Sequence, residues 1–142
     1  MFSEISELKS IRDQKSRLSE REAELSNPIL LDFNLISKVY QWFNEISENR
    51  DCPPRKDNVR SRKQFIFIVL FLYSPSVLAG GKMPKGLRKA ISDAVNLHSE
   101  STVSDNCADV VFLYQNYKDF RRDIDYLYSE IVNRLKGERG ER

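Results

Sequence analysis

Few side chains in this chain are suited to metal or nucleophilic chemistry, since it contains two cysteines and one histidine. Cys52 and Cys107 lie far apart, and neither has a second cysteine or histidine at the spacing that zinc sites use. His98 stands in a polar turn, where a histidine usually lies at the surface or forms hydrogen bonds. No carboxylate pair or nucleophile–base arrangement follows a known catalytic spacing. We therefore expect no enzyme activity, no catalytic residues, no metal and no cofactor.

Basic side chains are concentrated in the middle of the chain. Residues 51–95 carry nine basic and three acidic residues, whereas the segments before and after them each carry seven basic and nine acidic residues. A local excess of positive charge attracts phosphate, although a solvated linker and helix face have the same composition. The candidate phosphate contacts are Arg60, Arg62, Lys63, Lys82, Lys85, Arg88 and Lys89.

A helix–turn–helix pattern follows these cations. Apolar residues recur at helical spacing over 85–96, and after a short turn a second helix begins near Ser99 to Ser101. Such a second helix packs one face inward and presents the side chains of its first turn. Ser99, Ser101 and Thr102 are therefore candidate contacts to base edges or phosphates, and a helix N-terminus itself favours phosphate.

Two acidic residues near this turn oppose DNA affinity. Glu100 and Asp105 repel phosphate unless one of them accepts a hydrogen bond from a cytosine amine. Glu100 also has a structural interpretation, because acids favour the first turn of a helix and Ser99 or Ser101 is suited to cap it.

The elements around this pattern are predicted to be helices as well. Residues 3–26 place Leu8, Ile11, Leu18 and Leu25 on one stripe of a heptad pattern, with Lys15 and Glu22 at intervening seam positions. Such a helix either packs on its own domain or pairs as a coiled coil. A second helix over 29–48 has a wide apolar face, which packs on the C-terminal half or forms an interface with a partner or a second copy. The candidate interface residues are Leu31, Leu35, Val39, Trp42 and Phe43.

The second half begins after a proline-containing linker. Pro53-Pro54 cannot continue a helix, so residues 49–61 are predicted to connect two parts of the chain. The apolar run 65–73 has about half the length of a membrane span and is predicted to be a buried helix over 62–74. A turn-rich stretch with Gly80-Gly81 follows, and a closing helix covers 118–136.

Three segments of the second half share the pattern of a known family. RSRKQFIFIVLF is similar to a basic loop and first helix, LRKAISDAVNL to a supporting helix, and HSESTVSDNC to a signature that reads R-D-H-S/T-T-V followed by H-A-C. On these residues the chain from about 60 to 136 resembles the DNA-binding domain of the replication initiator DnaA, a Trp-repressor-like helix-turn-helix. The closest matches to the signature are Ser101, Thr102, Val103 and Cys107.

The resemblance implies duplex DNA binding, with Thr102 as a contact residue and Arg60, Arg62 and Lys63 as a basic approach. His98, Ser99 and Glu100 stand where the family has Arg, Asp and His, so its base-reading side chains are absent here. No G-x-x-x-x-G-K-[ST] sequence occurs, so no nucleotide-driven activity is implied.

Together these features predict an all-α protein with an N-terminal helical arm, 1–49, a linker, 50–57, a compact helix-turn-helix domain, 58–136, and a tail, 137–142. We expect a non-catalytic DNA-binding protein, either a regulator or a replication accessory factor, with a phage or a mobile element as a fitting source. The alternative is a structural or adaptor subunit of a virion or another assembly, without DNA binding. The expected partners are duplex DNA and, through residues 1–49, another protein or a second copy. No membrane and no small-molecule substrate are expected, and a polar N-terminus favours a cytoplasmic location.

Overall fold

The computed structural model describes residues 1–49, 58–97 and 99–138, and these residues confirm the all-α class. The predicted linker 50–57, with Cys52, lies outside the described residues, as do His98 and the last four residues of the predicted tail. In the described part, one short 3-10 turn and seven helices follow one another: α1 (Ser3–Leu25), η1 (Phe33–Leu35), α2 (Ile36–Glu48), α3 (Asn58–Tyr73), α4 (Pro75–Leu78), α5 (Leu87–Val95), α6 (Ser101–Asn116) and α7 (Lys118–Glu138).

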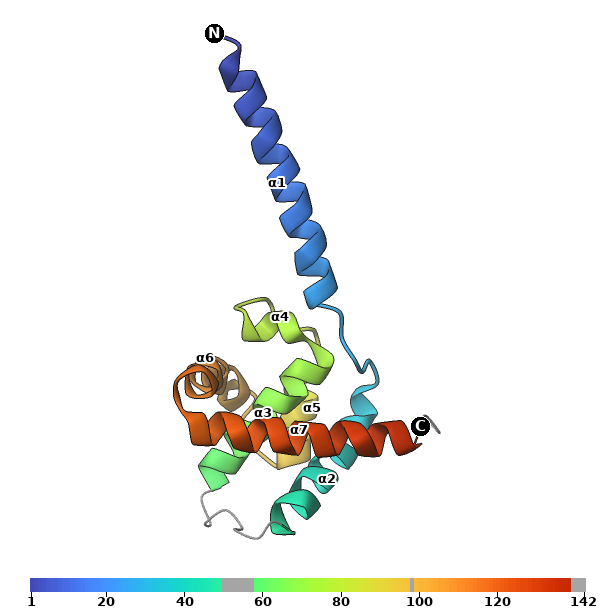
Figure 1. The fold of residues 1–142 in the computed structure, drawn as a ribbon. Coiled ribbons are helices and arrows are strands. Elements are labelled where there is room, and N and C mark those ends of the chain that lie inside the picture. The colour runs from blue at the N-terminus through green and yellow to red at the C-terminus, as the bar shows by residue number, and fades with distance from the viewer. Residues whose placement is uncertain (50–57, 98, 139–142) are drawn as a thin grey trace.

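Helix α3 is the centre of the body. Its apolar run is almost wholly buried, which confirms the prediction of a buried helix there. α2, α4, α5, α6 and α7 all contact α3, and α7 crosses in front of it in Figure 1. A helix that is apolar on nearly all sides needs partners around its whole circumference, and these five helices supply them. Its fully buried side chains are Phe65, Ile66, Ile68, Val69, Leu70 and Leu72.

Helix α2 packs on the C-terminal half, which is one of the two alternatives that its pattern left open. It contacts α5 and α7, and its apolar face lies in the same core cluster as α3. Two ion pairs join it to α7, Lys38 with Glu138 and Arg134 with Glu45, the latter at 2.6 Å. The body of the protein therefore includes α2 as well as the helices after residue 58.

This packing corrects part of the predicted partner interface. Val39 and Phe43 are 0% and 1% exposed because they fill the chain's own core, so neither can contact a partner. Leu35 and Trp42 are half-buried against that core, whereas Leu31 is 80% exposed. An amphipathic pattern predicts that a helix face is covered, but it does not distinguish the chain's own core from a partner.

The chain between α1 and α2 is tied to the end of α3. The backbone amides of Ile29 and Leu30 both donate to the carbonyl of Leu72, at 2.9 and 3.0 Å. The hydroxyl of Tyr73 donates to the carbonyl of Asp32 at 2.6 Å, and the Asp32 carboxylate accepts from the amide of Asn34. These bonds hold the segment after Pro28 in a non-helical path, so α2 begins at Ile36 and not near residue 29 as predicted.

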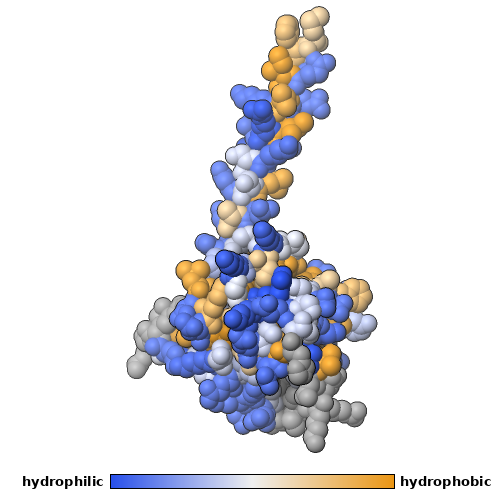
Figure 2. Space-filling model, turned by 180° about the vertical axis from the view of Figure 1, so that it is seen from behind, coloured by the Kyte–Doolittle hydropathy of each residue, from blue (hydrophilic) through white to orange (hydrophobic). Residues whose placement is uncertain are grey.

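Helix α1 projects away from the body (Figure 1). Its 23 residues match the predicted helix over 3–26, and none of them is buried. Of the predicted arm 1–49, therefore, only α1 stands apart from the body. Figure 2 shows hydrophobic side chains running along this helix beside hydrophilic ones, as expected for an amphipathic helix with one face left uncovered.

A short helix and a glycine turn connect α3 to α5. α4 lies within the turn-rich stretch, and Pro75 stands at its start, where a missing amide hydrogen costs nothing. The amide of Gly81 donates to the carbonyl of Ser76 at 2.8 Å. A Cβ atom on Gly81 would lie only 2.8 Å from that same oxygen, so the turn requires glycine there.

Candidate nucleic-acid interface

Helices α5 and α6 form the predicted helix–turn–helix pair, and the described residues at the end of α5 are held by backbone hydrogen bonds. Asn96 adopts a left-handed conformation with φ 62°, which asparagine tolerates better than most residues. The amide of Leu97 donates to the carbonyl of Ser92 at 2.9 Å, and this bond closes the end of α5. Asn96 and Leu97 therefore fix the point at which α5 ends.

The first turn of α6 is open to solvent. Ser99, Glu100 and Ser101 are exposed and Thr102 is half-buried. The hydroxyl of Ser99 accepts from the amide of Ser101 at 3.2 Å, and the two serine hydroxyls lie 2.7 Å apart. Ser99 thus satisfies the amide of Ser101 through a short-range bond, but the residue at the N-cap position is Glu100, and its side chain makes no capping bond. The prediction that Ser99 or Ser101 occupies the N-cap is therefore wrong.

The opposite face of α6 packs inward. Val103 and Val110 are fully buried, and Cys107, Leu113 and Tyr114 are packed against the core from the same helix. The ring of Tyr114 stacks on Phe67 of α3 with centroids 4.6 Å apart. α6 is therefore held through one face, while the start of the helix and its outer residues remain accessible.

Four of the predicted phosphate-binding cations surround the start of α5, and we call them the α5 cations. All four are exposed, and none forms an ion pair with the part of the chain that the structure describes. Burial raises the pKa of the Cys107 thiol, and the nearby charge of Arg88 opposes that rise. Helix α5 itself packs on α6. The α5 cations are Lys82, Lys85, Arg88 and Lys89.

Two of the predicted contacts on α3 are bound to carboxylates instead. Arg60 pairs with Asp123 of α7 at 3.1 Å, and its guanidinium lies 5.8 Å from the centroid of the Phe120 ring. Lys63 pairs with Asp109 of α6 at 3.7 Å. Arg62, between them, is half-buried and has no ion pair within the described ranges.

The predicted site residues consequently fall into two groups along α6. Asp109, which holds Lys63, comes eight residues after Ser101 and thus about 12 Å farther along the helix axis. Arg60 contacts Phe120, which lies beyond the end of α6. The α5 cations thus lie around the start of α5, which packs on α6. Lys63 and Arg60 instead contact the second half of α6 and the residues after it.

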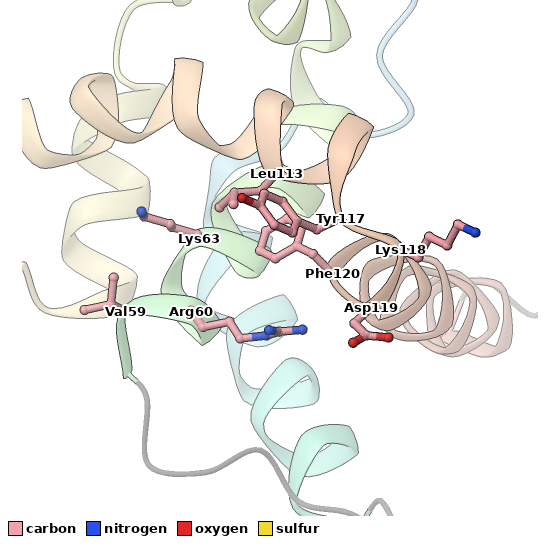
Figure 3. A pocket seen from close by; sticks show the side chains of 8 residues that line it. All are labelled: Val59, Arg60, Lys63, Leu113, Tyr117, Lys118, Asp119 and Phe120. Carbon is pink, nitrogen blue, oxygen red and sulfur yellow. The ribbon is translucent and has the colours of Figure 1, made fainter.

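A cleft that the sequence did not indicate lies between α3 and the corner joining α6 to α7 (Figure 3). It has a volume of about 620 Å³, and its lining includes Arg60, Lys63, Lys118, Tyr117 and Phe120. Figure 3 shows the ammonium groups of Lys63 and Lys118 pointing to opposite sides, away from the two rings. Because these charges do not converge, the cleft does not form a cage for an anion.

The corner beside this cleft is held by one arginine. Arg121 donates to the carbonyls of Tyr114 and Gln115, at 3.0 and 2.8 Å, and so satisfies the last turn of α6. The sequence signal for the corner is the change from one apolar stripe to another around Tyr117. This signal indicates a break between helices, but it does not predict a cleft.

The described residues contain no group of three or more metal-ligating side chains and no helix that is long and apolar enough to cross a membrane. Comparisons with known protein families, curated proteins and solved structures find no match to this chain.

Proposed function

We propose that this chain is a non-catalytic protein that binds duplex DNA through the α5–α6 pair. One observation carries the proposal: the first turn of α6 is exposed beside α5, and the α5 cations have no ion-pair partners among the described residues. Phosphate contacts position such a module on DNA, and side chains from the start of its second helix reach base edges. The resemblance to the DnaA DNA-binding domain supports the same function.

In this mechanism the α5 cations hold the DNA backbone. Each neutralised phosphate releases condensed counterions, which favours binding at low salt. The hydroxyls of Ser99, Ser101 and Thr102 then lie at the groove, where serine and threonine donate to or accept from base edges. Arg60 and Lys63 contribute less than the sequence suggests, because each already pairs with a carboxylate.

The test compares two double variants that remove the same charge. Arg88→Ala/Lys89→Ala removes two α5 cations, and Arg122→Ala/Lys136→Ala removes two exposed cations from α7. We expect the first variant to weaken binding to a random duplex and to reduce the slope of log affinity against log salt by about 1 for each lost contact. The second variant should bind nearly as the wild type does. Equal losses in the two variants would mean that net charge, and not the α5 cations, drives binding.

A second candidate function is favoured by α1. A 23-residue helix with no buried residue is typical of a protein that assembles with others, such as a structural or adaptor subunit. Assembly without any DNA affinity at low salt would favour this function over the first.

A further inference from the structure

Helix α1 exposes a row of large apolar side chains that the body does not cover. Leu8 is 54% exposed, Leu18 69% and Leu25 61%, while Ile11 at 40% lies on the same stripe. Isolated helices are only marginally stable in water, and most helical stability in proteins comes from packing an apolar face. This helix therefore needs a partner along the stripe.

A cleft at the base of α1 continues this stripe toward the body. It has a volume of about 740 Å³ and lies between the last turns of α1 and the segment from α4 to the glycine turn. Pro75 and Ala79 face it from the body, and Leu18 and Leu25 face it from the arm. The cleft thus offers an apolar surface at the end of α1 that adjoins the body.

The other end of α1 carries an apolar tip. Met1 is 98% exposed, Phe2 74% and Ile5 64%, and Figure 2 shows hydrophobic side chains gathered at this end. One arm therefore has an uncovered apolar tip at its start and an apolar cleft at its base. A second arm running in the opposite direction would bring each tip to the other's cleft.

We propose that α1 pairs with α1 of a second copy in antiparallel orientation, so that the tip of each arm lies in the cleft at the base of the other. With Leu8 opposite the partner's Leu18, the heptad pattern places Met1 opposite the partner's Leu25. A parallel pair would bring the two tips together and leave both basal clefts uncovered.

Charge favours the same orientation. In a parallel pair Glu4, Lys15 and Glu22 would each face the same residue of the partner across the seam, and like charges there are destabilising. In the antiparallel register Lys15 faces the partner's Ile11. Glu7 lies near the partner's Arg21 on both sides of the pair, although Arg21 also pairs with Glu24 of its own helix at 3.0 Å. Two unfavourable contacts remain, because the two-fold symmetry of the pair brings Glu4 of each copy opposite Glu22 of the other. The antiparallel register therefore has two like-charge contacts across the seam, and the parallel pair has three.

The orientation is tested by disulfide trapping in a Cys52→Ser/Cys107→Ser background. Leu8→Cys and Leu18→Cys are placed in separate chains, one of them carrying a size tag, and are mixed under mild oxidation. Antiparallel pairing brings these two positions within the Cα separation that a disulfide needs. We expect mixed dimers to form readily, and far fewer dimers when either variant is oxidised alone. Efficient trapping of each variant alone would show parallel pairing and overturn the proposal.

Self-association itself is tested by the mass of the full-length protein in solution, without DNA. We expect a concentration-dependent dimer for the wild type, a monomer for Leu8→Lys, and a dimer for Ser6→Lys, which adds the same charge on the opposite face. Circular dichroism should show that the body stays folded in both variants, because neither residue is buried. A wild-type protein that stays monomeric at every concentration overturns the proposal. Because no DNA is present, these results leave the proposed function untouched.

Discussion

Lys63 of α3 pairs with Asp109 of α6 at 3.7 Å, and this contact ties the first part of the central helix to the second half of the proposed recognition helix. Lys63 is largely covered, with 22% of its side chain exposed, whereas Asp109 is 62% exposed. The pair therefore positions α6 against α3 and occupies a cation that would otherwise be available to phosphate.

Replacing Lys63 should affect DNA binding less than replacing Arg88. We expect Lys63→Ala to leave affinity for a random duplex close to that of the wild type and to lower the free energy of unfolding by up to about 1 kcal/mol, as for a partly exposed ion pair. Arg88→Ala should weaken binding with little effect on stability. Fluorescence anisotropy measures the affinity and denaturant unfolding measures the stability. A larger loss of affinity in Lys63→Ala than in Arg88→Ala would show that Lys63, and not Arg88, is the phosphate contact.

Removing negative charge from the start of α6 should strengthen DNA binding. Glu100 and Asp105 are exposed at and near the start of α6, where the proposed mechanism brings DNA phosphates. We expect Glu100→Gln/Asp105→Asn to bind a random duplex more tightly, with the largest gain at low salt, where screening is weakest. Asp13→Asn/Glu20→Gln makes the same charge change on the face of the arm opposite the proposed seam and serves as the control. An affinity below that of the wild type would indicate that one of the carboxylates reads a base.

Phe43 should be required for the stability of the body. Its ring is 1% exposed and packs edge-on against Phe65 with centroids 5.5 Å apart. We expect Phe43→Ala to lower the free energy of unfolding by about 3 to 5 kcal/mol, since the substitution leaves a cavity in the core. Gln41→Ala, on the exposed face of α2, should change stability little. If Phe43→Ala instead converts a wild-type dimer into monomers without lowering the free energy of unfolding, Phe43 is an interface residue and not a core residue.

Alkaline pH should destabilise the fold through Tyr73. Burial, together with the nearby charge of Asp32, raises the pKa of Tyr73 from 10.0 to about 12. The unfolded chain therefore loses this proton at lower pH than the folded chain does, so stability is fully present below pH 10 and falls as pH rises toward 12. The contribution of one such group changes by at most about 1.4 kcal/mol per pH unit.

The measurement is the free energy of unfolding by denaturant, determined at pH values from about 8 to about 12. Tyr73→Phe removes the titrating group and should show a shallower loss of stability with pH than the wild type, although it also loses the bond to Asp32. Burial also raises the pKa of Tyr128. Tyr128→Phe, which removes a second buried phenol, is therefore compared with Tyr73→Phe over the same pH range. Identical pH profiles for Tyr73→Phe and the wild type would show that the Tyr73 hydroxyl is not buried in solution.

Local patterns in the sequence were sufficient to predict much of this fold. The apolar run of α3 predicts burial, and the predicted arm helix, 3–26, ends within one residue of the observed Leu25. Asn96 falls in the predicted turn, where its left-handed backbone ends α5. These features depend on residues that are close together in the chain, so the local sequence pattern is enough to predict them.

Features that depend on distant contacts were not predictable. The late start of α2 follows from bonds to Leu72, and the pairing of Arg60 with Asp123 joins residues on two helices far apart in the chain. The same cation is a free phosphate contact or a structural ion pair according to what tertiary packing brings beside it. The α5 cations and the first turn of α6 were predicted as candidate contacts, and their role in DNA binding stays a prediction.

The most direct test of the account is the affinity of the full-length wild-type protein for a random duplex, measured by fluorescence anisotropy over a range of salt concentrations. We predict binding at low salt that weakens linearly on a plot of log affinity against log salt, because phosphate contacts by the α5 cations release counterions. Absence of binding at the lowest salt, or an affinity independent of salt, would contradict the proposed DNA-binding function.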